Sequence, residues 1–414
     1  MIYDCIRKHF GVIIVIVTFI SRCVFVGFCW SYGTVIVELK KNSSLTDTEL
    51  SWIGSFGQTL GGVLAPLILY LVTHCGHQII FILSLLTCSF SLLLSSNIKN
   101  IHLLFLTYSV PYGFANASLV IIGTLLTGIY YPPEHEYHLL TICIISTGFP
   151  IGYHLMSAII FKWIQNDGWM EMNRRIGIIE FILTIVLGSL FSSKYILISQ
   201  TNTETEKNIR KFFSKKIIYW MIGIFTSMCS ISNFLLHLHS QLEILNITPA
   251  KADLWFRLHG LFDALFRFSV PFILKYFPIK IIYLFSIAAF SVFSFTSAVV
   301  TSLQYTVSSK LFDNNLREQG YCYHVIVTSL GTLFGPIIGG LLVDFTGSYK
   351  ILIPTSIILL FISFIGFTAN IFIDNSIPES THYHNQVQSN PNNMEQNCLT
   401  ERTNPAHDNF GYKN

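Results

Sequence analysis

Apolar stretches long enough to form membrane helices recur along the whole chain, with short polar segments or turn signals between them. A helix needs ~20 mostly apolar residues to cross a bilayer. Strands of a membrane barrel would instead show a period-two alternation over ~10 residues, and the sequence lacks that pattern. The sequence therefore predicts about eleven spanning helices, near residues 10–37, 50–73, 78–96, 101–129, 138–163, 174–198, 216–239, 253–275, 280–305, 321–343 and 350–373.

Three polar segments divide this pattern. The first, 38–49, is a short loop, and the second, 199–216, ends in a basic cluster near the middle of the chain. The third is rich in Asn, Ser, Thr and His, and we expect it to be disordered because it offers little apolar surface to bury. We predict an all-α protein with an amino-terminal six-helix bundle at 1–198, a cytoplasmic central loop at 199–216, a carboxy-terminal helical bundle at 217–373 and a polar tail at 374–414.

The composition supports an integral membrane protein. Of the 414 residues, 52% are hydrophobic and 11% charged, whereas a soluble domain carries roughly 25% charged residues. This excludes an ordinary cytosolic enzyme, a secreted disulfide scaffold and a disordered chain. A net charge of +3 without a basic stripe argues against nucleic-acid binding. No phosphate-binding glycine loop, metal-ligand cluster or hydrolase constellation is present, so we expect neither an enzyme nor a cofactor.

The basic residues predict the orientation. Arg7 and Lys8 precede the first span, and the central loop follows the sixth, so both clusters fall on one side, taken as cytoplasmic. The glycosylation sequons at Asn42 and Asn246 then lie outside. Only Arg174 and Arg175 count against this orientation. The basic residues of the central loop are Lys207, Arg210, Lys211, Lys215 and Lys216.

Short motifs stand in a fixed order along the predicted spans. They are Ser31-Tyr32-Gly33, Thr48-Glu49-Leu50-Ser51-Trp52-Ile53, Thr147-Gly148-Phe149-Pro150-Ile151-Gly152, Gly168-Trp169, Asp263-Ala264-Leu265-Phe266-Arg267, and Gly335-Pro336-Ile337-Ile338-Gly339-Gly340 followed by Asp344, Thr346, Gly347, Ser348 and Tyr349. Taken together, the ordered set resembles the monocarboxylate transporter family of the major facilitator superfamily.

The resemblance implies a twelve-helix fold that carries small carboxylates such as lactate or pyruvate, often together with a proton. The plasma membrane is the location it implies. Some members move aromatic amino acids or other organic solutes instead. A single-span glycoprotein often escorts such transporters to the surface, so the resemblance makes one a candidate partner besides the substrate, the proton and the lipid bilayer.

The sequence also departs from the family pattern. Lactate-type members carry a lysine late in the first span, where an ungapped alignment to Trp52 places Trp30. Basic residues usual in the loop after the fourth span are replaced by residues 130–136. The stretch between Pro278 and Gly331 is too short for two complete spans, so one helix equivalent of the second half is missing or fused.

Asp263 and Arg267 are the strongest candidate site residues. They are four apart, so they share one face of a helix, and charges inside a membrane helix usually face a cavity or a partner. We predict that Arg267 binds the substrate carboxylate, because a guanidinium matches a carboxylate bidentately. Asp263 is the predicted counter-charge and proton acceptor. The alternative is that the two residues only neutralise each other and fix the helix.

Three further residues are candidates for substrate binding. Arg22 lies midway along the first span and could replace the missing lysine, or could pair with a carboxylate elsewhere in the bundle. Asn116 interrupts the apolar fourth span, where it lines the path or bonds to a neighbouring helix. Tyr32, near the end of the first span, is an outer-gate residue or an interfacial anchor.

The sequence predicts a transporter of small monocarboxylates, either facilitative or coupled to protons. Two alternatives stay open. The absent lysine favours a uniporter of aromatic amino acids or other organic solutes. The short second half favours a transporter-like membrane protein that does not transport, since two bundles must pack around a shared site to alternate access.

Overall fold

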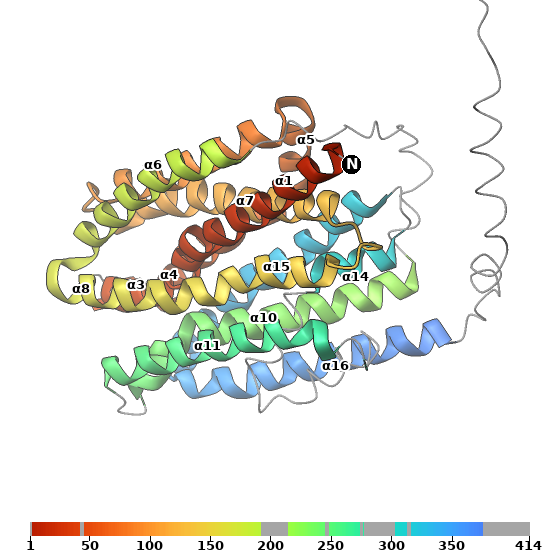
Figure 1. The fold of residues 1–414 in the computed structure, drawn as a ribbon. Helices are drawn as coiled ribbons and strands as arrows, with labels where there is room; N and C mark the ends of the chain where they lie inside the picture. The colour runs from red at the N-terminus through yellow and green to blue at the C-terminus, as the bar shows by residue number, and fades with distance from the viewer. Residues whose placement is uncertain are drawn as a thin grey trace, which may run out of the picture. The chain divides into compact units, whose positions relative to one another are not determined.

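The computed structural model describes residues 2–41, 45–191, 214–244, 248–273, 276, 303–312 and 316–375. Every regular element within those ranges is helical, which confirms the predicted all-α class. The described helices pack within one compact unit, Met1–Ile371, in which most of them run side by side (Figure 1). The elements are α1 (Ile2–Ser21), η1 (Arg22–Val26), α2 (Gly27–Trp30), α3 (Tyr32–Lys41), α4 (Asp47–Val63), α5 (Ala65–Cys75), α6 (His77–Ser95), η2 (Ile101–Leu103), η3 (Phe105–Ser109), α7 (Val110–Tyr130), α8 (His138–Leu190), α10 (Lys215–Ile244), α11 (Pro249–Ile273), α14 (Gln304–Leu311), α15 (Arg317–Thr346), η5 (Tyr349–Ile351) and α16 (Leu352–Asn375).

Several predictions concern residues outside these described ranges. Most of the predicted span 280–305, nearly all of the central loop 199–216 and of the tail 374–414, and both sequon asparagines lie outside the described residues. So does much of the stretch between Pro278 and Gly331, in which one helix equivalent is predicted to be missing or fused. The boundaries of the two predicted bundles stay predictions.

Seven helices of the described part are long and apolar enough to cross a membrane, or eight if a bent pair counts as one span. One of the seven, α8, has 53 residues, which at 1.5 Å per residue is well over twice the ~30 Å bilayer core. The chain reverses inside it at Gly168, whose φ of 80° is easy only for glycine. The two predicted spans 138–163 and 174–198 therefore correspond to the two arms of α8 (Figure 1).

The predicted span 50–73 is not one straight helix. It consists of α4 and α5, which meet at Leu64 with a bend of 54°. Pro66 stands at the start of α5, and a proline lacks the amide that a continuous helix would need there. The local cause of the bend is therefore visible in the sequence.

The first span carries a π-helical turn, η1, between α1 and α2. A π turn adds one residue to the helical ladder and often occurs at functional sites. Here it contains Arg22, and close packing surrounds it: a Cβ on Gly27 would come within 2.5 Å of the backbone of Gly152 in α8. Such glycine contacts let membrane helices approach closely, and they bring the first span against α8 beside the cavity described below.

Candidate substrate cavity

A cavity of about 150 Å³ lies among the helices, midway along the spans of the amino-terminal and carboxy-terminal parts of the chain. Residues from η1, α2, α4, α7 and α8 line it together with residues from α10, α11, α14 and α15. Much of the wall is apolar, with Val26, Ile121, Ile142 and Ile231 among its residues. The polar groups that interrupt this wall are therefore the candidates for orienting a solute.

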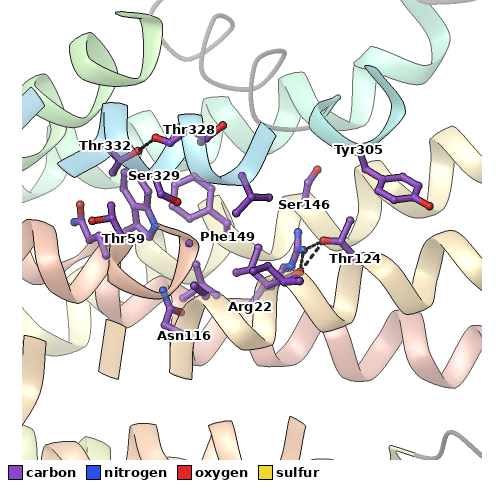
Figure 2. Close-up of a pocket in the computed structure, with 18 of the residues that line it drawn as sticks. Arg22, Thr59, Asn116, Thr124, Ser146, Phe149, Tyr305, Thr328, Ser329 and Thr332 are labelled. Carbon is purple, nitrogen blue, oxygen red and sulfur yellow. Dashed lines mark hydrogen bonds between the residues drawn. The ribbon is translucent and has the colours of Figure 1, made fainter. Parts of the chain in front are cut away.

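Arg22 is a buried cation at this cavity. It lines the cavity, and only 7% of it is exposed. Its guanidinium donates to the Thr124 hydroxyl at 2.5 Å and to the carbonyls of Val120 and Ile145 at 3.0 and 3.4 Å (Figure 2). Its Nε has no hydrogen-bond partner, and no Asp or Glu of the described residues pairs with it. Hydroxyl and carbonyl oxygens therefore solvate a full buried charge that they do not neutralise.

Asp263 and Arg267 form a buried ion pair on α11. The Arg267 guanidinium donates to the carboxylate in a two-pronged contact, with Nη2 at 2.9 Å and Nε at 3.2 Å from the Asp263 oxygens. Its Nη1 donates to the Ser146 carbonyl at 3.2 Å, and the guanidinium lies 5.1 Å from the centre of the Phe149 ring. Arg267 itself lines the cavity. A charged pair is thus held at the wall, with its cation facing the space.

A group of small polar side chains lies on the same cavity, away from Arg22 (Figure 2). The Thr332 hydroxyl donates to the Thr328 carbonyl of its own helix, as expected of a threonine in a membrane helix. Asn116 is 2% exposed, and its side-chain oxygen has no hydrogen-bond partner. This group consists of lining residues from α4, α7 and α15: Gln58, Thr59, Asn116, Thr328, Ser329 and Thr332.

The structure brings together three of the five predicted site residues at the cavity: Arg22, Asn116 and Arg267. Asp263 is held against Arg267, one step behind the lining. Tyr32 is not among the lining residues. Its ring stacks on that of Tyr108, with centroids 4.3 Å apart.

Polar contacts close one end of the helix array. Lys40 lies 2.7 Å from Asp47 in an ion pair, and the Tyr349 hydroxyl bonds to both side chains. The carboxylate of Asp344 accepts hydrogen bonds from the first residues of α4. These contacts join the start of α4 to the end of α15 and to η5.

A second group of contacts lies toward the other end, at the loop between α7 and α8. Arg317 donates to Glu134 at 2.5 Å, and His138 lies 3.1 Å from the Thr306 hydroxyl. The hydrogen bond from Arg317 lowers the pKa of the exposed Glu134 carboxyl. The cavity is thus flanked at both ends by contacts between early and late parts of the chain.

The comparisons with known proteins agree with this architecture. The model of the Major Facilitator Superfamily matches residues 18–303, more than half of the chain. The chain belongs to the major facilitator superfamily. This confirms the superfamily that the ordered motifs indicated, and it makes the chain an integral membrane transporter that handles a small-molecule solute.

Two relatives of this major facilitator protein are named monocarboxylate transporters. It is 26% identical to monocarboxylate transporter 9 of Rattus norvegicus over 149 residues, which is 36% of this chain and 29% of that protein. With the Gallus gallus protein of the same name the identity is 25% over 158 residues, 38% and 31% of the two chains. The matches span less than a third of the length of these relatives.

Solved structures share the fold at low identity. The D-xylose-proton symporter superposes with a TM-score of 0.65 and 14% identity, over 89% of this chain and 98% of that one. The nucleoside transporter NupG gives a TM-score of 0.62 at 14% identity, over 88% and 99%. These likenesses establish the major facilitator fold and leave the solute to the cavity's own chemistry.

Glu180 and, apart from Asn116, the small polar side chains at the cavity are not among the residues predicted from the sequence. Glu180 is buried in the second arm of α8, and its sequence signal was plain, since it is a lone carboxylate in an apolar span. Thr328, Ser329 and Thr332 gave no such signal, because hydroxyl residues are common in membrane helices and face any direction.

Proposed function

We propose that this major facilitator protein transports small monocarboxylates such as lactate or pyruvate together with a proton. The observation that carries the proposal is Arg22, a buried guanidinium at the cavity with no carboxylate partner among the described residues. A buried charge without a counter-ion is costly. An anionic solute in the cavity would supply the missing charge, and a guanidinium binds a carboxylate well.

The buried pair on α11 supplies a route for the proton. While Asp263 is ionised it occupies two nitrogens of Arg267. Protonation of Asp263 would weaken this ion pair. Arg267 could then bind the incoming carboxylate together with Arg22. A monoanion and a proton add no net charge, so the loaded and empty sites carry the same charge. The closed ends would then open in turn around this site.

The cavity size favours a small acid. Its volume of about 150 Å³ equals that of an engineered cavity that takes up benzene, and lactate and pyruvate have as many non-hydrogen atoms as benzene. The names of two similar proteins, monocarboxylate transporter 9 and the D-xylose-proton symporter, lend support to the carboxylate and to the proton respectively. We extend the proposal to the plasma membrane, a cytoplasmic amino terminus and an escorting single-span glycoprotein.

The test is uptake of labelled lactate and pyruvate by expressing cells, at acidic and neutral external pH, with surface protein measured in the same cells. Uptake that rises with acidity and is lost in Arg22→Gln supports the proposal. Arg174→Gln is the matched control, because Arg174 is half exposed and pairs with Glu171 away from the cavity. Full uptake by Arg22→Gln at equal surface level would refute the assignment.

A uniporter of aromatic amino acids is the second candidate, and one observation favours it. Trp30, which replaces the lysine of lactate-type relatives, lines the cavity and packs edge to face on Phe149 at 5.0 Å. Aromatic walls suit an aromatic side chain. Competition separates the two candidates: excess lactate should suppress uptake of a labelled monocarboxylate, whereas uptake of phenylalanine that ignores lactate would favour the uniporter.

A further inference from the structure

Glu180 lies in the second arm of α8, away from the cavity lining, and is 0% exposed. Within the described part of the chain it belongs to no ion pair. The titratable groups near it on the packed elements are Cys29 of α2, Cys88 of α6, Tyr108 of η3 and Tyr112 of α7. None of them is a base, so nothing nearby balances a negative charge on this carboxyl.

A count of hydrogens decides its protonation. The Tyr112 hydroxyl lies 2.7 Å from Oε1 of Glu180 and 2.9 Å from the carbonyl of Phe25. A phenol has one hydrogen, so it cannot donate to two acceptors at full strength. If Glu180 is a carboxylic acid, its own hydrogen goes to the Tyr112 oxygen, and Tyr112 donates to Phe25. Both contacts are then satisfied hydrogen bonds.

An ionised Glu180 would leave this site with one hydrogen bond fewer. A Glu180 carboxylate would take the hydrogen of Tyr112, and the contact with Phe25 would lose its donor. The other oxygen, Oε2, has no hydrogen-bond partner in either case. A buried carboxylate with one hydrogen bond and no cation is strongly disfavoured.

We propose that Glu180 is a proton-binding site of this transporter, separate from Asp263, and that its proton keeps Tyr112 bonded to Phe25. Phe25 belongs to η1, the π turn that also carries Arg22. When Glu180 releases its proton to water, the carboxylate takes the hydrogen of Tyr112, and the hydrogen bond that fixes this turn is lost. Protonation of Glu180 therefore stabilises the turn that presents Arg22 to the cavity.

This gives Glu180 a positioning role. It touches no solute, and it acts on Arg22 through Tyr112 and the backbone of the first span. The binding of a proton at Glu180 stands independently of the solute, whereas its consequence for uptake rests on the proposed function. The two parts call for separate measurements.

The first measurement is infrared spectroscopy of the purified full chain in lipid vesicles at neutral pH. A protonated carboxyl has a carbonyl stretching band that a carboxylate lacks. The wild type minus Glu180→Gln difference spectrum should contain this band, and the difference for Glu171→Gln should not, because Glu171 is partly exposed and paired with arginines. A carboxylate signature for Glu180 at neutral pH would overturn the proposal.

The second measurement is the dependence of uptake on external pH. Glutamine keeps a hydrogen for Tyr112 but cannot titrate. Glu180→Gln should therefore flatten the pH profile of uptake, or shift its midpoint by about one pH unit or more, which is a tenfold change in proton concentration. Tyr112→Phe should raise the KM several-fold at neutral pH. Tyr108→Phe is the control, since among the described residues the Tyr108 hydroxyl makes one hydrogen bond, to the Cys29 sulfur at 3.9 Å.

The outcomes separate the two proposals. Profiles that coincide for wild type, Glu180→Gln and Tyr112→Phe would overturn the coupling role while leaving monocarboxylate transport intact. If the wild type takes up no monocarboxylate, the proposed function fails, and the infrared spectrum alone decides whether Glu180 holds a proton.

Discussion

The carboxylate of Asp344 caps the amino-terminal end of α4 through Thr48, although 296 positions separate these residues in the chain. It accepts from the Thr48 amide at 3.1 Å and also from the Thr48 hydroxyl. The first amides of a helix have no partner within it, and the helix dipole favours a negative charge there. A residue of α15 thus completes a helix of the first half, at an end that must separate if access to the cavity alternates.

Removal of this cap should loosen that end. Asp344→Ala is expected to lower the stability of the purified protein by about 1 kcal/mol, the usual worth of a helix cap, and to lower its melting temperature in detergent. Asp344→Asn retains an acceptor oxygen and should recover part of the loss. Equal melting temperatures for Asp344→Ala and the wild type would contradict a contribution of the cap.

Local rules predicted the parts of the site that lie on one helix. The spacing of Asp263 and Arg267 already placed them on one face, and the structure pairs them. The partners of Arg22 were out of reach, because Thr124 and Ile145 are 102 and 123 positions away. Which side chains surround a buried charge depends on how helices pack, and hydrophobic pattern alone does not fix the rotation of each helix.

The same limit explains the other differences. A hydropathy pattern shows that residues 50–73 are apolar, but a bend at Leu64 depends on the proline that follows it. From its position in the span, Tyr32 was predicted to be an outer-gate residue or an interfacial anchor. Its ring packs on Tyr108, a contact with another span that no motif encodes.

Close glycine packing between η1 and α8 should tolerate no side chain. A Cβ on Gly152 would clash with the backbone of Cys23, whose Cα would lie 2.7 Å away. Gly152→Ala is expected to cost about 1–3 kcal/mol through overpacking and to reduce surface expression. Gly188→Ala in the same helix is the control, because its Cβ would meet only the side chain of Ile82, at 3.2 Å. Comparable surface levels for both variants would contradict this account.

The Glu134–Arg317 contact should not provide the acid response of transport. Arg317 lowers the pKa of Glu134, so Glu134 stays ionised even below its ordinary pKa, and the contact is lost only as pH falls through the lowered value. Mild acidity therefore leaves it intact. Glu134→Gln should keep the acid dependence of uptake and change at most its maximal rate, as measured by a pH series in vesicles. Loss of the acid response in this variant would contradict this prediction, because it would show that Glu134 takes part in the acid dependence of uptake.

The buried pair on α11 should behave as a unit. Asp263→Asn removes the carboxylate that pairs with the buried Arg267, and Arg267→Gln removes the guanidinium that pairs with the buried Asp263. Each single change is expected to cost about 3–5 kcal/mol and to lower the surface level. The double variant Asp263→Asn with Arg267→Gln buries no charge at this point, so it should express better than either single variant.

Transport by the same double variant separates structure from function. It should reach the surface and still take up no monocarboxylate, because it has lost both a guanidinium at the cavity and the carboxyl proposed to bind the proton. Labelled uptake normalised to surface protein makes the comparison across the four proteins. If the double variant transports as well as the wild type, the pair serves only to neutralise charge in α11, and the proton has to bind elsewhere, with Glu180 as one candidate.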